Sequence, residues 1–334
     1  MKNKHIFLIA EAGVNHNGNL VLAKKLADIA KLAGSDAVKY QTFIPEDFVT
    51  KSAGLADYQK KTEGKKQSQL SMVQKLALSF QDFREIKEHC DRIGIVFLST
   101  PFDYKSMSFL DELNMPIWKI PSGEITNLPY LMRIAHTNKP VLLSTGMSNL
   151  EEIRFAVESL RAGGSSYITL LHCNSAYPTP IDDANLLAIN TLRDTFGLPV
   201  GYSDHTTGIE AALAAAAMGA VVIEKHFTLN KNMKGPDHKA SLDPKELETM
   251  VKGIRKIEKA MGSGIKKPSQ SEAVNINVVR KSIVAKRKIK FGEVFSEENL
   301  AVKRPGDGIS PVKWFEVIGK IAIRDFDEDE LIEL

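Results

Sequence analysis

The chain has 334 residues, of which 43% are hydrophobic and 25% charged, as in an ordinary globular protein. Its net charge of +3, from 44 basic and 41 acidic residues, is too small to indicate bulk binding to nucleic acid. The two cysteines have neither metal-finger nor disulfide spacing, and no apolar run comes near the length of a membrane helix. The first apolar run is also too short for a secretory signal. These observations predict a cytoplasmic protein without membrane partners.

Eight short apolar runs follow one another, and stretches with helical period lie between most of them. The runs lie at residues 5–10, 37–43, 95–100, 116–121, 139–145, 167–173, 198–203 and 219–226. Clear helical stretches lie at residues 21–32, 79–93, 149–162 and 208–218. Eight strands that alternate with helices close into a (β/α)8 TIM barrel, whose parallel strands all end at one rim. Polar and charged residues at the end of nearly every run predict an active site at that rim.

Two segments depart from this alternation. Residues 44–78 contain a polar stretch, 51–69, that is too long for an ordinary connection and predicts a lid or a wall at the rim. From Gly262 the sequence GSGIKKPSQSEA is rich in Gly, Ser and Lys, as linkers are. We therefore predict a catalytic barrel over residues 1–262, a linker over 263–281 and a small, mostly β domain over 282–334. Such a small domain has a marginal core and is expected to dock on its own barrel or on a partner's.

Two histidines end the seventh and eighth predicted strands, His205 and His226. These strands are neighbours in a closed barrel, so both imidazoles are expected at the same part of the rim. Neutral imidazoles are the commonest metal ligands, and two of them leave positions open for substrate and water. The pattern predicts a catalytic divalent metal, and hydrogen-bonded barrel histidines are the alternative. Asp204 and Glu224 are then either ligands, orienting groups or salt-bridge partners.

Two lysines, Lys39 and Lys119, end the second and fourth predicted strands, and strand alternation points both toward the barrel mouth. The hydroxyl groups expected beside them belong to Ser122, Ser144, Thr145 and Ser203. Such a group of donors suits a phosphate. The alternatives are a salt bridge to Glu11 or Glu124, or a Schiff base as in barrel aldolases. Glu11 and Glu124 themselves are candidates for proton transfer, water activation or contacts with sugar hydroxyls.

Several familiar motifs are absent from the sequence. There is no GxxxxGK[ST] loop, no dinucleotide fingerprint after the first strand, no HExxH and no GxSxG. Their absence argues against nucleotide hydrolysis, nicotinamide chemistry and serine-hydrolase action. What remains is a barrel rim that offers a divalent metal, a phosphate pocket and contacts for a polyol.

A series of ordered segments resembles the sialic acid synthase family, which condenses phosphoenolpyruvate with an N-acetylmannosamine-type sugar. The segments are EAGVNHNG (11–18), VKYQTF (38–43), STPFD (99–103), WKIPSGE (118–124), LSTGM (143–147), LHCNSAYPTP (171–180), YSDHT (202–206), EKHFT (224–228), GPDHKAS (235–241) and VKRPGDGIS (302–310). The resemblance covers essentially the whole chain and is strongest at YSDHT and EKHFT.

The resemblance implies roles for individual residues. His205 and His226 would hold the divalent metal, usually Mn²⁺ in the family, with Mg²⁺ or Co²⁺ as alternatives. The positions that match phosphoenolpyruvate contacts are Lys39, Thr100, Lys119, Ser122, Ser144, Asn174 and Ser203. The positions that match the sugar or metal side are Gln41, Tyr177 and Asp237. Glu11 and Glu124, together with Lys39 and Lys119, match catalytic positions.

The resemblance also extends to the C-terminal domain, which in this family is similar to type III antifreeze protein (a SAF domain) and crosses to the other subunit of a dimer. It implies a domain-swapped homodimer in which Arg304 lies over the partner's sugar. The alternative is that Arg304 pairs with the acidic tail of its own domain. The chain departs from related sequences at Ser175 and Ala176, and at Asp307 in the GDG loop.

These observations lead to a functional hypothesis. The enzyme condenses phosphoenolpyruvate with 2,4-diacetamido-2,4,6-trideoxymannose to give N,N'-diacetyllegionaminate and phosphate, by attack of carbon 3 on the aldehyde, addition of water at carbon 2 and C–O cleavage. The small Ala176 favours this less polar acceptor over N-acetylmannosamine, which would give N-acetylneuraminate. A Schiff-base barrel aldolase and a non-catalytic sugar-binding protein are the alternatives from other classes.

Overall fold

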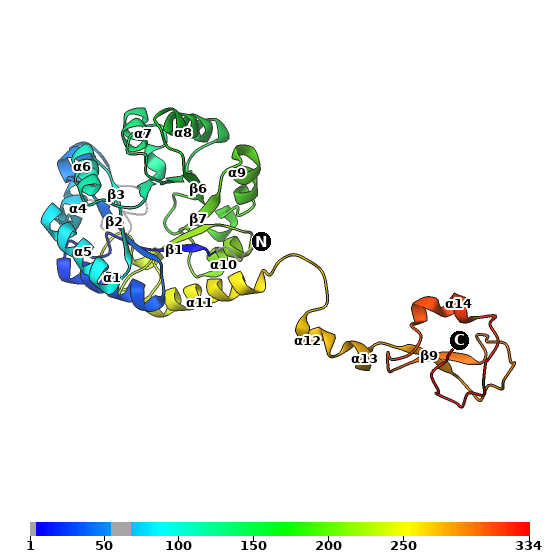
Figure 1. Ribbon diagram of the computed structural model, residues 1–334. Coiled ribbons are helices and arrows are strands. Elements are labelled where there is room, and N and C mark those ends of the chain that lie inside the picture. The colour runs from blue at the N-terminus through cyan, green and yellow to red at the C-terminus, as the bar shows by residue number, and fades with distance from the viewer. Residues whose placement is uncertain (1–4, 55–67) are drawn as a thin grey trace. The chain divides into compact units, whose positions relative to one another are not determined.

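The computed structural model of the protein describes residues 5–54 and 68–334. It divides into two compact units, Met1–Ser263 and Gly264–Leu334. The first unit contains a sheet of eight parallel strands, with helices arranged around it (Figure 1). The strands are β1 (Phe7–Gly13), β2 (Ala37–Thr42), β3 (Val96–Pro101), β4 (Trp118–Ile120), β5 (Val141–Ser144), β6 (Ile168–Cys173), β7 (Val200–Asp204) and β8 (Val222–His226). Each overlaps one of the predicted apolar runs.

The strand order is β3-β2-β1-β8-β7-β6-β5-β4, and the two outer strands, β3 and β4, also contact each other. This arrangement closes the sheet, and the prediction of a TIM barrel is confirmed. The register fixes which side chains meet at the rim, because Glu11 on β1 is opposite Lys39 on β2 and opposite His226 on β8. On the next strand pair, Ser203 of β7 is opposite Glu224 of β8.

Most helices of the first unit begin at a polar capping residue, whereas α2, α9 and α10 begin at Ile44, Leu187 and Ile209 without a side-chain cap. They are α1 (Leu20–Ala33), α2 (Pro45–Phe48), α4 (Gln69–Leu76), α5 (Phe80–Ile93), α6 (Tyr104–Glu112), α7 (Leu128–Ala135), α8 (Leu150–Ala162), α9 (Ala188–Phe196), α10 (Glu210–Ala217) and α11 (Pro244–Ala260). Ser79, Asn149 and Asp243 form capping boxes that satisfy the first N–H groups of α5, α8 and α11. The four predicted helical stretches correspond to α1, α5, α8 and α10.

The core of the barrel has two layers. The large outer layer lies between strands and helices, where alanines such as Ala212 and Ala215 let α10 pack closely on the wall. A small inner cluster fills the barrel below the rim with Ile9, Ala37, Leu98, Leu142, Leu171 and Val222. Since this apolar cluster fills the lower interior, the polar residues near the strand ends are left to line the mouth.

The segment that interrupts the alternation contributes part of the rim. Its described flanks form α2 and α4, which pack with Val14 and Phe43 in a cluster that includes Met72, Val73 and Leu76. These residues form a wall, as predicted for residues 44–78. Most of the polar stretch 51–69 lies outside the described residues, since residues 55–67 are among those left out.

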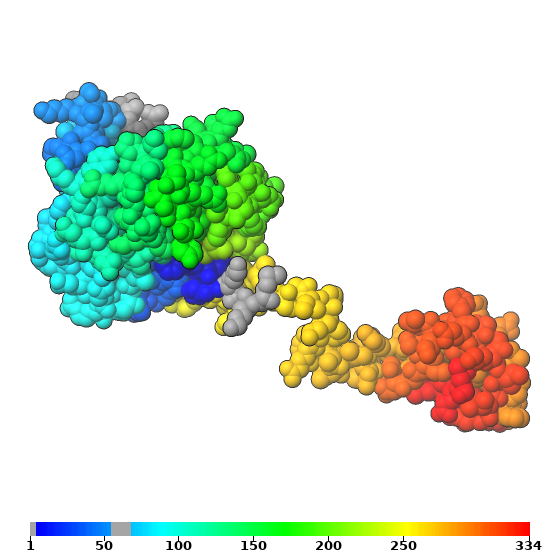
Figure 2. Space-filling view, turned by 45° about the horizontal axis from the view of Figure 1, so that its top comes forward, coloured from blue at the N-terminus to red at the C-terminus, as the bar shows by residue number. Residues whose placement is uncertain are grey.

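The second unit has its own small core around Ile283, Phe295 and Phe326. Its elements are α12 (Gln270–Ala273), α13 (Ile276–Val279), β9 (Ser282–Ala285), β10 (Leu300–Lys303) and α14 (Trp314–Val317), and the two strands pair in antiparallel fashion. In the space-filling view the side chains of this unit, orange to red, pack against one another (Figure 2). Within residues 5–54 and 68–334, no helix combines the length and the apolar character needed to cross a membrane.

Candidate active site

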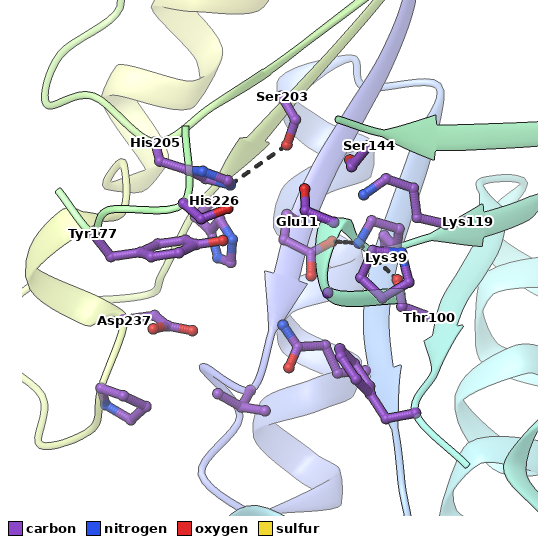
Figure 3. Close-up of a pocket in the computed structure, with 18 of the residues that line it drawn as sticks. Glu11, Lys39, Thr100, Lys119, Ser144, Tyr177, Ser203, His205, His226 and Asp237 are labelled. Atoms are coloured by element: carbon purple, nitrogen blue, oxygen red, sulfur yellow. Dashed lines mark hydrogen bonds and ion pairs between the residues drawn. The ribbon is translucent and has the colours of Figure 1, made fainter. Parts of the chain in front are cut away.

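A cavity of about 300 Å³ opens at the carboxyl ends of the barrel strands. Most of the predicted site residues line it: Glu11, Lys39, Gln41, Thr100, Lys119, Ser122, Ser144, Tyr177, Ser203, His205, His226 and Asp237. They come from seven of the eight strands and from the loops that follow β4, β6, β7 and β8. Figure 3 shows the lysines and Glu11 on one side, and the histidines, Tyr177 and Asp237 on the other.

One side of the cavity is a buried network of two lysines and two carboxylates. The Nζ atom of Lys39 lies 2.5 Å from Oε2 of Glu11 and 3.6 Å from Oε2 of Glu224. Lys119 reaches across the barrel from β4, and its Nζ atom lies 3.2 Å from Oε1 of Glu224. Ser203 donates a hydrogen bond of 2.8 Å to the same Glu224 oxygen. Both lysines therefore point into the barrel with carboxylate partners already in place.

Burial and charge act differently on the two carboxyl groups of this network. Burial raises the pKa of Glu11 to about 7, although Lys39 opposes the rise, and the neighbouring Glu224 adds to it. Burial alone would also raise the pKa of Glu224, but Lys119 and Lys39 together hold it well below its usual range. Glu224 is therefore the ionised partner of both lysines. Glu11 gains or loses its proton near neutral pH, which suits a group that transfers protons.

Further donors surround the two lysines. Lys39 donates a hydrogen bond of 3.1 Å to Oγ1 of Thr100 (Figure 3). The hydroxyl oxygen of Ser144 is buried and has no hydrogen-bond partner among the described residues. A buried hydroxyl without a partner is costly, so a ligand that bonds to Ser144 would remove that cost. Ser122 accepts a hydrogen bond of 2.9 Å from the N–H of Gly146. A side chain at residue 146 would collide with Ser122, because a Cβ atom there would lie only 2.8 Å from the Ser122 hydroxyl oxygen.

The two histidines face each other on the opposite side of the cavity. Their ring centroids are 5.5 Å apart, and the ring of Tyr177 packs at 4.2 Å from His205 and at 5.7 Å from His226. Burial lowers the pKa of His205 to about 4. Burial, together with the neighbouring His205 and Lys39, lowers the pKa of His226 well below its usual value. Both imidazoles are therefore neutral at pH 7 and have a lone pair for a metal ion.

The hydrogen bonds of these rings fit a metal. The Nδ1–H group of His205 donates to the carbonyl oxygen of Asn174 at 2.6 Å, which leaves Nε2 without the proton. The Nδ1 atom of His226 is buried and has no hydrogen-bond partner in residues 5–54 and 68–334. In the same residues no group of three or more His, Cys, Asp or Glu side chains is arranged to hold a metal. The two histidines fit one divalent ion whose remaining positions are left to water and substrate.

Asp237 lies beside the histidines in the loop after β8 and is buried. Its carboxylate makes no side-chain hydrogen bond or ion pair with the described residues, and burial raises its pKa to about 6. An ionised carboxylate without a partner is costly in such a place. A cation or a hydroxyl group of a ligand would supply the missing partner.

Replacing Asp237 by asparagine is expected to stabilise the metal-free barrel above pH 6. In the folded state the pKa is about 6, and in the unfolded state about 3.9. Between these values the folded state binds more protons, so the stability of the unsubstituted protein falls as pH rises through this window. We expect Asp237→Asn to raise the free energy of unfolding by about 3 kcal/mol at pH 7.5, with little difference below pH 4. Urea unfolding in EDTA at both pH values measures this.

The matched control is Asp182→Asn, because Asp182 is exposed. This variant should show no pH-dependent gain in stability. An equal gain for both variants at pH 7.5, or a gain for Asp237→Asn that persists below pH 4, would contradict the prediction.

The outer wall of the cavity is apolar. It consists of Val14, Phe43, Met72, Val73 and Leu76. The rings of Phe48 and Phe102 pack at 4.8 Å from each other and also line the cavity. The cavity therefore has a charged side near the barrel axis and an apolar side at the rim.

Four predicted site residues do not line this cavity. Thr145, expected beside the lysines, instead donates its hydroxyl to the carbonyl oxygen of Leu171 at 3.1 Å. Glu124 ends the short 3-10 helix Ser122–Glu124 and accepts a 2.6 Å hydrogen bond from Asn127, beside a neighbouring hollow. The Asn174 side chain accepts a hydrogen bond from the N–H of Ala176, while its carbonyl oxygen orients His205. Arg304 lies in the second unit, where its Nε–H donates to the carbonyl oxygen of Val279 at 3.0 Å. The structure does not bring Glu124 or the side chain of Asn174 to the lysine network.

The structure also decides between the roles left open for Asp204 and Glu224. Asp204 forms a wholly buried ion pair with Lys225, behind the histidines. Glu224 lines the cavity and pairs with the two lysines, so of the three roles left open for it the structure shows that of a salt-bridge partner. Strand alternation predicts that Glu224 faces the cavity, because residues 224 and 226 of one strand point to the same side and His226 is at the rim.

Comparison with known proteins gives a family for the chain. The sequence profile of the NeuB family matches residues 26–266, and that of the SAF domain matches residues 280–333. The chain is 56% identical to N,N'-diacetyllegionaminic acid synthase of Campylobacter jejuni, over 98% of this chain and 99% of the relative. It is 47% identical to the enzyme of the same name from Legionella pneumophila, over 94% of this chain and 89% of the relative.

A solved structure supports the same conclusion. The crystal structure of N-acetylneuraminic acid (sialic acid) synthetase from Leptospira borgpetersenii, in complex with citrate, superposes with a TM-score of 0.74 at 36% identity. The match covers 82% of this chain and 91% of that chain. Both units of the chain thus have counterparts in sequence, most of the chain also has one in a solved structure, and the chain belongs to the NeuB family of synthases.

Proposed function

We propose that the protein is an N,N'-diacetyllegionaminic acid synthase, which condenses phosphoenolpyruvate with 2,4-diacetamido-2,4,6-trideoxymannose and releases phosphate. The observation that carries the proposal is its similarity, over nearly the whole chain, to two synthases of that name. The polar side of the cavity supports the reaction class, because it holds an anion-binding group and a metal-binding group together.

The lysine network is the proposed site for phosphoenolpyruvate. When Glu11 is protonated, Lys39 and Lys119 carry two positive charges against the single negative charge of Glu224. The network then has a net positive charge in a buried place, where charge attracts a phosphate and a carboxylate strongly. The hydroxyl of Ser144 is an additional donor.

The histidine side is the proposed site for the sugar aldehyde. His205 and His226 would hold the divalent metal, which we propose to be Mn²⁺. When bound, the metal supplies polarisation of the aldehyde carbonyl, which makes its carbon electrophilic. Asp237 and Gln41 line the same side and are proposed to bind hydroxyl groups of the open-chain sugar, while Tyr177 keeps both rings in place.

Glu11 is the proposed proton-transfer group. It lies between the two halves of the site, opposite Lys39 on one strand and His226 on the other. In its protonated form it would give a proton to the aldehyde oxygen as carbon 3 attacks, and in the ionised form that results it would accept a proton from the water that adds at carbon 2. Lys39 and Lys119 hold the phosphate while the C–O bond breaks and the 2-keto acid forms. Glu124 has no place in this scheme, since its carboxylate lies outside the cavity.

The apolar wall supports the choice of acceptor. The proposed sugar has a methyl group at carbon 6 and an acetamido group at carbon 4, where N-acetylmannosamine has hydroxyl groups. A hydroxyl against Met72, Val73 and Leu76 would be left without a hydrogen-bond partner, whereas a methyl group is favourably buried there. Pockets of this kind discriminate between such groups by about 10- to 100-fold.

The test of the function is phosphate release from phosphoenolpyruvate with Mn²⁺ and each acceptor in turn. We expect release with both the diacetamido sugar and N-acetylmannosamine, with kcat/KM at least about 10-fold higher for the former, and no release with EDTA. Preference for N-acetylmannosamine would refute the proposed acceptor. Release that survives EDTA, or trapping of the substrate on a lysine by borohydride, would refute the metal-dependent mechanism and favour a Schiff-base aldolase.

We also propose that the protein acts as a homodimer in which Arg304 reaches the sugar bound by the partner subunit. The support is the resemblance of the second unit to SAF domains. Mixing two inactive variants, His226→Ala and Arg304→Ala, tests this. In a mixed dimer the barrel of the Arg304→Ala subunit keeps its own His226 and receives the intact Arg304 of the other subunit, so that one barrel is complete. Activity is expected to recover to about one quarter of that of the unsubstituted protein. No recovery after subunit exchange would show that Arg304 acts within its own subunit.

A further inference from the structure

We infer that the buried ion pair between Asp204 and Lys225 is a positioning device that holds His205 and His226 at the spacing a shared metal needs. The inference rests on the proposed metal site. Each member of the pair directly precedes one of the two histidines, Asp204 on β7 and Lys225 on β8. The pair does not line the cavity, so its effect on the site is indirect.

The pair connects the two strands at the position of the histidines. Asp204 and Lys225 are opposite each other in the β7–β8 register, and the Lys225 Nζ atom lies 2.8 Å from Oδ2 of Asp204. Both side chains are wholly buried. Since side chains alternate along a strand, the pair lies on the outer side of the barrel wall, while His226 and Ser203 face the cavity. The nearby charges of Glu210 in α10 and Glu246 in α11 agree with this placement.

The same two side chains also hold the main chain around His205. Lys225 donates a second hydrogen bond, of 2.5 Å, to the carbonyl oxygen of Thr206. The Oδ1 atom of Asp204 accepts hydrogen bonds from the N–H of Thr206 at 2.9 Å and from its hydroxyl at 2.8 Å. His205 therefore lies between two residues that are both bound by Lys225, and Lys225 is the residue before His226. The backbones of the two proposed ligands are joined by one short chain of polar contacts.

The energetics argue against a purely stabilising role. Removing two charges from water costs several kcal/mol per ion, so a buried pair is often no more stable than apolar residues of the same size. Its benefit is a fixed geometry, because the ammonium has two acceptors and the carboxylate three donors, all in defined directions. A metal site with only two histidine ligands needs such support, since small shifts of its ligands weaken binding.

The test measures Mn²⁺ binding directly. The neutral double variant Asp204→Asn/Lys225→Met removes both charges and avoids leaving one of them buried alone. Titration calorimetry of the full chain with Mn²⁺ is expected to show a dissociation constant raised about 10- to 100-fold. The KM for phosphoenolpyruvate is expected to change little, because Lys39 and Lys119 are untouched. The matched control is Arg255→Met/Asp36→Asn, which removes a 2.7 Å ion pair away from the rim and should leave the Mn²⁺ affinity unchanged.

A milder variant covers the case in which the double variant does not fold. Thr206→Val removes only the hydroxyl contact to the Asp204 carboxylate and, because its effect on the metal is indirect, should weaken Mn²⁺ binding by only about fivefold. Unchanged Mn²⁺ affinity in the folded double variant, or in Thr206→Val if the double variant is unfolded, would overturn the inference. So would an equal loss in the Arg255/Asp36 control. Failure of the unsubstituted chain to bind Mn²⁺ would instead overturn the proposed metal site itself.

Discussion

Replacing His226 by alanine is expected to lower kcat/KM for the condensation by about three orders of magnitude or more. The reason is that His226 is one of two histidines proposed to hold the metal, and a single remaining imidazole is a weak site. Calorimetry should show the loss of Mn²⁺ binding together with the loss of phosphate release. The barrel should stay folded, because the ring lines a cavity and its Nδ1 atom leaves no described hydrogen-bond partner behind.

The matched control for this variant is His136→Ala. His136 is exposed at the end of α7, on the outer side of the barrel. We expect it to retain the activity and the Mn²⁺ affinity of the unsubstituted protein. Turnover by His226→Ala that approaches that of the control, or turnover that survives in metal-free buffer, would refute the proposed role of the histidine pair.

Replacing Lys119 by methionine is expected to raise the KM for phosphoenolpyruvate by about 100-fold, the effect of losing one strong charge-assisted contact in a buried place. The KM for the sugar should change much less, because Lys119 lies on the other side of the cavity from the histidines (Figure 3). Phosphate-release kinetics with each substrate varied in turn give both constants. The surface lysine Lys87, which pairs with Asp91 within α5, provides the control Lys87→Met.

The loss of Lys119 also leaves Glu224 with one lysine partner fewer. The double variant Lys119→Met/Glu224→Gln separates binding from folding, because it removes the charge of both members of the pair. It should melt near the temperature of the unsubstituted protein and still show the raised KM for phosphoenolpyruvate. A KM for phosphoenolpyruvate that does not change in either variant would refute the proposed anion site.

Together these experiments distinguish the two halves of the site. The histidine variant changes metal binding and sugar activation, and the lysine variant changes phosphoenolpyruvate binding. The buried carboxyl of Glu11, with its pKa raised to about 7, lies between them. This placement is what the proposed condensation requires, because the proton-transfer group must reach both the aldehyde oxygen and the water at carbon 2.

The sequence by itself determined the barrel and the ends of its strands. Apolar runs of strand length that alternate with helical period are local patterns, and a two-residue period decides which side chains share a face. Lys39 with Gln41, and Glu224 with His226, therefore point into the barrel wherever the strand is regular. The two histidines at successive strand ends could be predicted as neighbours for the same reason.

Only the tertiary structure decided which charges pair with each other. Lys119 and Glu224 are 105 residues apart and meet across the barrel interior, a contact that depends on the closed shape rather than on any local pattern. Glu124 turns away because the chain leaves β4 through a short 3-10 helix, where strand alternation no longer applies. Asp204 finds Lys225 because the β7–β8 register places them opposite each other. Local periodicity fixes the direction of a side chain, but its partner and its pKa depend on what the folded barrel brings within a few ångströms of it.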